Sequence, residues 1–301
     1  MRAKYYLAAV TAFTIWGLFS FVLRPLHAYP SPDILFYRIF LCVILMVITN
    51  LTVRRAKLMQ ARDFFRQLPS ARRKNLALLT VLSSILLAAN WFFFIYVMNH
   101  ISVKAAAFSY LICPLITTVF AFIILKEKLS VLQWFSILVS AAACVLLSFN
   151  HVADLGYSLL VACSYALYLV LQKKFDGIDK FVLLSAQLVI TAVFLLPFYG
   201  VYSGAMPLEP IFWIYIVVIA IGFTIVPMLL NLFALKGIAS STLGILMYIN
   251  PIIGFMLAAF FYKEEITPAQ IVSYSLIAVS IALFNIGSYL KLRRVNKNAT
   301  L

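Results

Sequence analysis

Arg38 is the most strongly polar residue inside an apolar segment of this 301-residue sequence. It follows Asp33 by five residues, which in a helix places it about 7.5 Å further along the axis. An arginine in that position can attract a carboxylate or another anionic group of a ligand. It can also pair with Asp33 or extend toward water at the segment end, and its modest depth favours this second interpretation.

Amide and aromatic side chains interrupt other apolar segments. The amide of Asn90, beside Trp91, can donate and accept hydrogen bonds, which suits a zwitterionic ligand but equally serves to tie two helices together. Trp16 can stack on a flat ligand or pack within the protein. Tyr165 and Gln187 are weaker candidates for ligand contacts.

Prolines accompany polar residues in two apolar segments: Tyr110 with Pro114, and Tyr248 with Asn250 and Pro251. A proline frees the backbone carbonyl four residues earlier and loosens the helix. Pro227 can do the same in a third segment. We expect the Pro114 and Pro251 pair to shape a cavity or a gate, with a static kink as the alternative.

Acidic and histidine residues avoid the apolar segments. None of the nine Asp and Glu residues falls in the middle of such a segment, and the three His residues lie near segment ends. Clustered His, Cys or carboxylate ligands for a metal are absent, as are a nucleophile–base pair and a phosphate-binding P-loop. The sequence therefore predicts a protein that is not an enzyme and has no catalytic residue, metal or cofactor.

The apolar segments that must position these residues make up most of the chain. Hydrophobic residues account for 65% of the sequence and charged residues for only 11%. Because a bilayer is spanned by about 20 apolar residues in a helix, the class is an all-α membrane protein. Hydropathy and helix breakers predict ten spans, at about 5–23, 34–53, 76–97, 103–125, 131–149, 157–171, 181–199, 211–235, 240–262 and 269–290.

The distribution of basic residues indicates how these spans are oriented across the membrane. With the N-terminus in the cytoplasm, the cytoplasmic loops and termini hold 20 of the 24 Lys and Arg residues. This asymmetry predicts that both termini are cytoplasmic. The net charge of +15 is thereby explained by topology and by contact with anionic lipid headgroups, so nucleic acid is not an expected partner.

The string ILKEKLSVLQ at 124–133 is echoed by FYKEEITPAQ at 261–270, an offset of 137 residues. Pro114 aligns with Pro251 and Gln133 with Gln270. Five predicted spans separate the copies, and an odd number places them in opposite orientations. The sequence therefore predicts two inverted five-helix repeats, 1–150 and 151–301, with a substrate site between them near the middle of the membrane.

Longer motifs resemble a known family. The strings IWGLFSFVLRPL, SPDILFYRIF, NWFFFIYVMN and YLICPLITTVFAFIILKEKLSVLQW, with YINPIIGFMLAAFFYKEEITPAQ later, resemble the RarD-like branch of the EamA family, in the drug/metabolite transporter superfamily. This resemblance implies ten helices, a central cavity, and export of small metabolites or drugs across a bacterial inner membrane. Residues 108–110 read Phe-Ser-Tyr where the family has Leu-Gly-Tyr, which affects helix packing or cavity width.

The combined expectation is an inner-membrane exporter of small organic molecules, foremost amino acids or related metabolites, that works by alternating access. Because membrane proton relays are usually built from Asp, Glu and His, we expect facilitated transport or exchange. A proton-coupled exporter of aromatic or amphiphilic drugs, with coupling through Tyr or Lys104, is one alternative, and a non-transporting structural subunit is another. The expected partners are the substrate and membrane lipid, in a monomer or weak homodimer.

Overall fold

The computed structural model describes residues 3–100, 103–148, 155–263 and 265–298, and the secondary structure within these ranges is entirely helical. Eight helical segments are long and apolar enough to cross a membrane, by length and composition. Two further apolar helices, α7 and α8, are shorter. The all-α membrane class is thus observed, whereas the count of ten spans stays a prediction.

The N-terminal helices are α1 (Ala3–Gly17), α2 (Ser20–Leu23), the 3-10 helix η1 (Arg24–Leu26), α3 (Ser31–Leu51), α4 (Arg55–Gln67), α5 (Ser70–His100), α6 (Val103–Leu125) and α7 (Val131–Ser148). The C-terminal helices are α8 (Leu155–Gln172), α9 (Lys180–Tyr202), α10 (Pro210–Val218), η3 (Ile219–Ile225), α11 (Val226–Ala234), α12 (Ser240–Leu246), α13 (Ile249–Met256), η4 (Leu257–Phe261) and α14 (Pro268–Asn298).

Three of the long segments are not continuous α-helices. The first breaks after Gly17, where α1 gives way to α2 and η1. The segment 210–234 contains the π-helix η3, and the segment 240–261 breaks at Met247 and Tyr248 and ends in the π-helix η4. Such irregular backbone frees carbonyl and amide groups, which inside a membrane must be satisfied by neighbouring helices or by a wet cavity.

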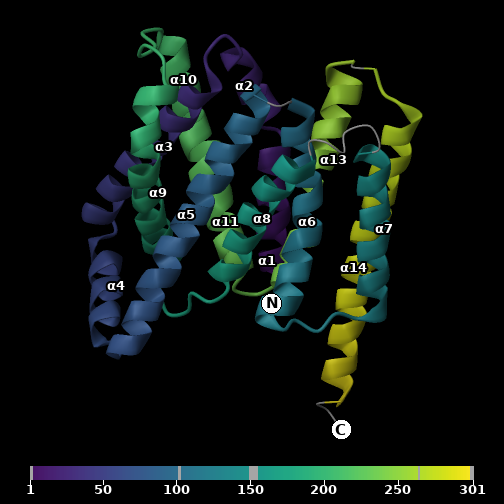
Figure 1. Ribbon diagram of the computed structural model, residues 1–301. Coiled ribbons are helices and arrows are strands. Elements are labelled where there is room, and N and C mark those ends of the chain that lie inside the picture. Colours follow the sequence, from purple (N-terminus) through teal and green to yellow (C-terminus); the bar gives the residue numbers. More distant parts are fainter. Residues whose placement is uncertain (1–2, 101–102, 149–154, 264, 299–301) are drawn as a thin grey trace.

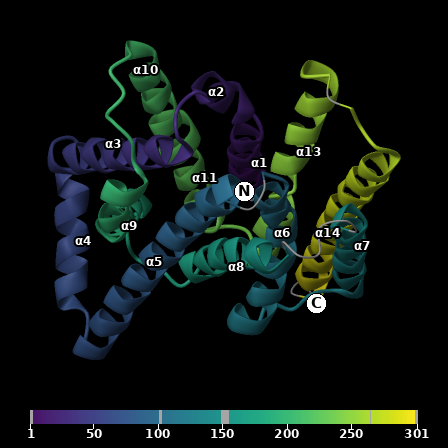
Figure 2. The ribbon, with the colours of Figure 1, turned by 45° about the horizontal axis from the view of Figure 1, so that its top comes forward.

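The helices form one bundle with α7 and α14 standing together at its edge (Figure 1). In the turned view, α8 lies between α5 and α6 (Figure 2), and α1 packs against α11 and α13. Helix α8 contributes more residues than any other helix to the largest buried apolar cluster, and α1, α6 and α11 pack residues into the same cluster. This central group of helices positions the residues discussed below.

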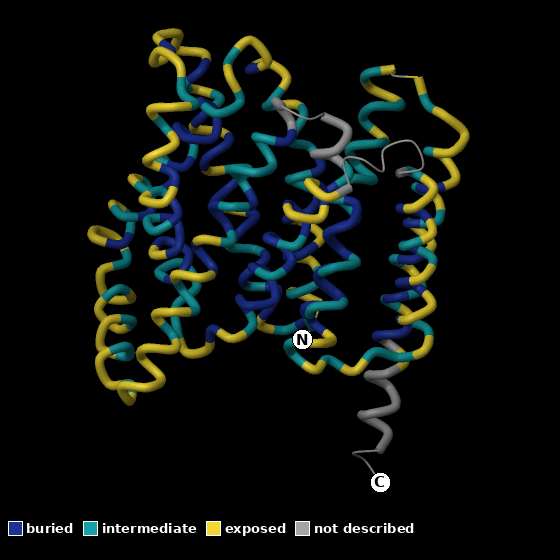
Figure 3. The backbone as a smooth tube through the Cα atoms, viewed as in Figure 1, coloured by how far each residue is buried: buried dark blue, intermediate teal, exposed yellow. Residues whose placement is uncertain are grey.

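The outer faces of the bundle are largely exposed (Figure 3) and carry many large apolar side chains. Large side chains such as Ile44, Leu138 and Val201 point outward without covering by other described residues. In water, apolar patches of this extent are costly, whereas lipid tails solvate them. The surface chemistry is therefore that of a protein embedded in a bilayer.

The two copies of the Lys-Glu string adopt the same backbone conformation. Lys126 and Lys263, 137 positions apart, have φ angles of 54° and 53° and are the non-glycine residues with positive φ in the described ranges. The loop after α6 lies at the lower end of the bundle in Figure 1, and the loop between α13 and α14 lies at the upper end. The repeated sequence thus produces the same local structure at opposite ends of the molecule.

The helix starts that follow these loops are also alike. The backbone N–H of Ser130 donates to Gln133 Oε1 at 2.8 Å, and Gln133 N–H donates to Ser130 Oγ at 3.3 Å. The corresponding distances for Thr267 and Gln270 are 2.9 Å and 3.3 Å. Both are reciprocal capping boxes, which fix where a helix begins.

The basic loop after α3 contains the surface helix α4, which has no buried residue. Arg54 precedes it and forms an ion pair of 2.9 Å with Asp179. Asp179 also caps α9 by accepting from the backbone N–H groups of Phe181 and Val182. Burial alone would raise the pKa of Asp179, but these backbone bonds and the Arg54 guanidinium together lower it below its ordinary value of 3.8.

Candidate functional site

A cavity of about 550 Å³ lies among the central helices. Its volume is within the range of about 300–1,000 Å³ that is usual for small-molecule sites. Its walls come from α1, α2, η1, α3, α5, α6 and α8 of the chain up to Gln172, and from η3, α11, α13 and η4 after it. Aromatic side chains dominate the lining: Trp16, Phe19, Trp91, Phe94, Tyr110, Tyr165, Phe223 and Tyr262.

The cavity extends from the interior of the bundle to one of its ends. Tyr165 of α8 and Met247 at the break after α12 line its inner part, and Met247 is buried. Arg24 of η1 and Tyr262 after η4 line its outer part. Because Arg24 is exposed, the cavity reaches the surface at the end where α2 lies, the top of Figure 1.

Six of the nine residues that the sequence marked as substrate-binding candidates line this cavity: Trp16, Arg38, Trp91, Tyr110, Tyr165 and Asn250. They come from six different helices, between 16 and 250 in the sequence. The fold therefore brings together residues that sequence spacing alone could not relate.

Trp16 is fixed in the wall by a freed carbonyl. Pro227 has no N–H to donate to the carbonyl of Phe223, and the indole Nε1 of Trp16 donates to that oxygen at 2.8 Å instead. The π-helix η3 is tied to α3 in a similar way, since Cys42 Sγ donates to the carbonyl of Ala220 at 3.4 Å. The prediction that Pro227 frees a carbonyl inside its segment agrees with this geometry.

Arg38 presents an unpaired cation to the cavity. The expected pairing with Asp33 is wrong, because Asp33 accepts instead from Ser203 Oγ at 2.5 Å and from the N–H of Gly204 at 3.1 Å. Asp33 is therefore already satisfied as an anchor between α3 and the segment after α9. The buried Nε of Arg38 has no hydrogen-bond partner, and its guanidinium lies 5.1 Å from the ring centroid of Trp91.

A second arginine stands at the mouth of the cavity. The guanidinium of Arg24 lies over the ring of Tyr262, 3.3 Å from the centroid. Tyr262 also donates to Ser20 Oγ at 3.3 Å, so its ring is held between η1 and α2. The entrance is thus formed by a cation–π contact between the two sequence halves.

Uncharged polar groups complete the inner wall. Thr224 donates to the carbonyl of Ile219 at 3.0 Å, which satisfies one of the carbonyls of the π-helix η3. Asn231, on α11 one turn beyond the lining residue Met228, is only 2% exposed, and its amide lies beside the hydroxyl of Tyr165, which lines the cavity.

Three of the predicted candidates do not line the cavity. The amide of Asn90 donates to the carbonyl of Val161 at 2.9 Å and so joins α5 to α8. Gln187 exchanges hydrogen bonds with Gln172 and lies on α9. Tyr248 is fully buried, with its hydroxyl 3.9 Å from Cys144 Sγ on α7. These side chains contact other helices, because a polar group in a membrane helix can be satisfied by helix–helix bonding as well as by a ligand.

The two prolines also lie behind the lining. Pro114 is inside α6, which continues through it, and its carbonyl accepts from Thr118 Oγ1 at 2.9 Å. A Cβ on Gly244 of α12 would lie 3.3 Å from that same oxygen, so α12 packs closely against α6 there. Pro251 follows the break between α12 and α13. The gating roles predicted for Pro114 and Pro251 stay predictions.

At the other end of the bundle, charged side chains cap helix ends. Glu127, in the loop after α6, accepts from the N–H of Ser240 at 2.8 Å, from the N–H of Ser241 at 3.0 Å and from Ser241 Oγ at 2.6 Å. A carboxylate at a helix N-terminus is stabilised by the helix dipole. Glu127 therefore holds the start of α12, whose residues are all buried.

Lys173 acts on the same connection from α8. Its Nζ donates to the carbonyl of Leu235 and, at 2.8 Å, to that of Ile238, both in the connection that follows α11. Burial lowers the pKa of Lys173, although the charges of Glu127 and Asp176 counteract this. Glu127 and Lys173 together fix the connection between α11 and α12, which lies opposite the mouth of the cavity.

Carboxylates do not line the cavity in the described part of the chain. Within the same residues, groups of three or more His, Cys, Asp or Glu side chains that could hold a metal do not occur. Lys104, named above as an alternative group for proton coupling, has a side chain outside the described residues. The chemistry that the lining offers is aromatic stacking, hydrogen bonding by hydroxyls and an amide, and two guanidinium groups.

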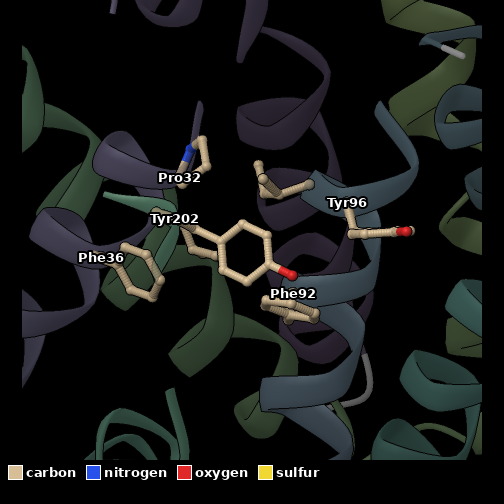
Figure 4. A pocket seen from close by; sticks show the side chains of 7 residues that line it. Pro32, Phe36, Phe92, Tyr96 and Tyr202 are labelled. Carbon is tan, nitrogen blue, oxygen red and sulfur yellow. The ribbon is translucent and has the colours of Figure 1, made fainter. Parts of the chain in front are cut away.

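A second, much smaller cavity of about 10 Å³ lies between α3, α5 and α9 (Figure 4). Figure 4 shows the ring of Tyr202 reaching across it between Phe36 and Phe92. The ring centroids of Phe92 and Tyr202 are 5.4 Å apart. A space of this size holds one water molecule at most, so it is not a site for an organic ligand.

Several lining residues escaped the sequence analysis. Arg24 reads as a loop charge, and Tyr262 as an interfacial aromatic, because the breaks that turn both toward the cavity carry no strong sequence signal. Asn231, which lies behind the lining, had one sequence signal, because it is a polar side chain in a predicted span. Phe94 and Met228 resemble any other apolar residue of a helix.

Sequence comparison places these features among known proteins. The sequence model of the EamA-like transporter family matches the chain twice, over residues 3–149 and 155–286. The protein YojE of Bacillus subtilis (strain 168), described as an uncharacterized transporter, is 29% identical over 290 residues, and the alignment covers 95% of each chain. Protein RarD of Escherichia coli (strain K12) is 26% identical over 305 residues, covering 97% of each.

A solved crystal structure shares the fold. It superimposes with a TM-score of 0.76 over 98% of this chain and 99% of its own, at 17% sequence identity. At that identity the likeness concerns the fold alone. The described architecture therefore belongs to a fold that is already known.

Proposed function

The chain belongs to the EamA-like transporter family, and from this premise we propose that it carries small organic molecules through the central cavity by alternating access. Its relatives are named as transporters, so the chain is a multi-pass membrane transporter and not an enzyme. The observation that supports the proposed mechanism is the cavity of about 550 Å³, which reaches the surface at the end of the bundle where Arg24 and Tyr262 lie. Alternating access requires a central site that opens to one side of the membrane at a time.

We propose further that the two matched regions, 3–149 and 155–286, are inverted repeats of five helices each, which makes ten spans. The equal φ angles of Lys126 and Lys263, and the matching capping boxes that follow them, support this division. Helices α7 and α14, which start at these boxes, pack against each other. The two halves can then rock about the site between them.

In this arrangement the structure corresponds to an outward-facing state. The basic loops predict that the end bearing Glu127 and Lys173 is cytoplasmic, as are both termini. Those two side chains then form the closed inner gate, and Arg24 and Tyr262 stand at the open outer mouth. Release of the Glu127 bonds to α12 is the step that opens the inner end.

The substrates we propose are amino acids or related metabolites, exported across the inner membrane of a bacterium. The guanidinium of Arg38 and the amide of Asn250 in an aromatic wall suit such molecules. Because the described lining holds no carboxylate, the transport is proposed to be facilitative or an exchange. The aromatic lining also supports a second candidate function, the export of aromatic or amphiphilic drugs.

The test is efflux from proteoliposomes preloaded with labelled amino acids and one aromatic drug. Efflux above that of protein-free vesicles, and indifferent to a pH gradient, is the expected result and names the substrate class at the same time. Efflux that requires the pH gradient would show that transport is coupled to protons and is not facilitative. A protein that moves none of these compounds and only supports a complex would be a structural subunit.

A further inference from the structure

The charge of the cavity wall is unbalanced. Arg38 makes neither a hydrogen bond nor an ion pair with any described residue, and its Nε is buried without a partner. Arg38 is half-buried, and a guanidinium drawn partly out of water without a counter-ion is costly, so such groups are usually paired with a carboxylate or a phosphate. Because Asp33 is committed to Ser203 and Gly204, the missing anion does not come from the nearest acidic residue of the same helix.

The rest of the described lining gives a positive group no counter-charge. Among the described lining residues there is no Asp or Glu that could hold an ammonium group. The ring of Trp91 already faces the guanidinium of Arg38, and the ring of Tyr262 faces that of Arg24. The carbonyl of Phe223, freed by Pro227, is occupied by the indole of Trp16. An ammonium group would thus meet two cations and no anion.

On the basis of the proposed function, we propose that the substrate is an organic anion: a carboxylate on an aromatic or other apolar body, with the carboxylate at Arg38. The two oxygens of a carboxylate match the planar donors of a guanidinium. The apolar body lies against Trp16, Tyr110 and Tyr165, which surround the inner part of the cavity. The α-ammonium group of an amino acid then contributes nothing to binding.

Three ligands that share a phenyl ring and differ in charge test whether the site prefers an anion. At pH 7, 3-phenylpropionate is an anion, phenylalanine a zwitterion and 3-phenylpropylamine a cation. We would measure the dissociation constant of each from the purified full chain. Quenching of tryptophan fluorescence reports binding, since Trp16 and Trp91 line the cavity. We expect 3-phenylpropionate to bind at least as tightly as phenylalanine, and both to bind at least about tenfold more tightly than the amine.

The variant Arg38→Gln keeps a polar side chain that can donate hydrogen bonds and removes its charge. We expect it to weaken 3-phenylpropionate at least about tenfold while leaving the neutral analogue 3-phenylpropanol unchanged. The matched control is Arg62→Gln, the same substitution at an exposed position of α4 outside the cavity, and it should change neither constant. A melting curve for each variant verifies that it is folded.

Equal binding of the amine and the carboxylate overturns the proposal, as does an equal loss of all ligands in Arg38→Gln or no binding of 3-phenylpropionate at all. Counterflow of the same labelled compounds in proteoliposomes separates this proposal from the proposed function. Binding without flux leaves the anion site standing and removes the transporter role. Flux of the amine alone leaves the transporter role standing and removes the anion site.

Discussion

Replacing Glu127 by Gln should loosen the closed end of the bundle. The Glu127 carboxylate accepts three hydrogen bonds from Ser240 and Ser241 at the start of α12. A Gln side chain keeps one acceptor oxygen but turns an amide donor toward the other N–H group. It also removes the negative charge that the helix N-terminus stabilises.

The size of the effect follows from these contacts. Loss of a helix cap costs about 0.5–2 kcal/mol, and loss of a favourable charge at a helix N-terminus about 0.3–1 kcal/mol. Taken together, about 2 kcal/mol of the stability of the closed end should disappear. This corresponds to an increase of about 30-fold in the population in which α12 is released.

Hydrogen–deuterium exchange in lipid nanodiscs measures that population. In wild type, the amides of α12 should exchange slowly because all residues of this helix are buried. In Glu127→Gln they should exchange about 30-fold faster, in proportion to the opening equilibrium. The matched control is Glu265→Gln, at an exposed glutamate near the other end, which should leave the exchange of α12 unchanged.

Unchanged exchange of α12 in Glu127→Gln, with the variant folded, would refute the assignment of Glu127 as the group that holds this end closed. Faster exchange over the whole chain would also refute it, because that result shows general destabilisation. The specific prediction is an effect confined to α12 and to the adjoining ends of α11 and α6.

Three further predictions concern single side chains. Trp16→Phe removes the hydrogen bond to Phe223 and leaves a carbonyl unpaired in the cavity wall. The free energy of unfolding should fall by about 1–3 kcal/mol, which lowers the melting temperature. An unchanged melting temperature would contradict this hydrogen bond. Gly17→Ala places a Cβ 2.7 Å from Cβ of Ile253 and should cost about 1–3 kcal/mol by thermal unfolding, whereas a neutral outcome would mean that α1 and α13 are less tightly packed. Asp179 has a pKa below its ordinary value of 3.8, so its charge stabilises the protein above pH 3.8, and this stabilisation is lost as the pH falls through the lowered pKa. The difference in melting temperature between wild type and Asp179→Asn should therefore vanish in stronger acid. A difference that persists there would show that it does not come from the charge of Asp179.

The sequence predicted the helical class and the repeated motif because both depend on local patterns. Apolar runs of span length are read directly, and the capping residues Ser130, Gln133, Thr267 and Gln270 fix two helix starts in the structure. The same local information gives the freed carbonyl at Phe223, since the absence of an N–H on Pro227 is a property of one residue.

The candidate site was less predictable because it depends on contacts between distant segments. Arg38 and Asn90 look alike in sequence, as polar residues inside spans, yet Arg38 faces the cavity and Asn90 bonds to the carbonyl of Val161. The choice between pairing with Asp33 and facing a ligand was decided by Ser203, which is 170 residues from Asp33 in sequence. Such competition between partners is visible only once the helices are packed.

The role of Glu127 was also beyond the sequence. It belongs to the repeated Lys-Glu string, which indicates duplication and not function, and its partners Ser240 and Ser241 lie in the other half of the chain. Only the packing of α12 against α6 brings them together. Glu127 of the repeated motif thus forms a stabilising contact between the two halves of the chain. Composition and hydropathy do not predict this contact.

Counterflow in proteoliposomes is the measurement that tests the account most directly. Vesicles containing the protein and loaded with unlabelled 3-phenylpropionate are diluted into the labelled compound without a pH gradient. An alternating-access carrier with an anion site at Arg38 predicts transient accumulation of label that depends on the internal load, and its loss in Arg38→Gln but not in Arg62→Gln. Uptake that equals that of protein-free vesicles for this compound, and for phenylalanine as well, would contradict both the carrier mechanism and the site assigned to it.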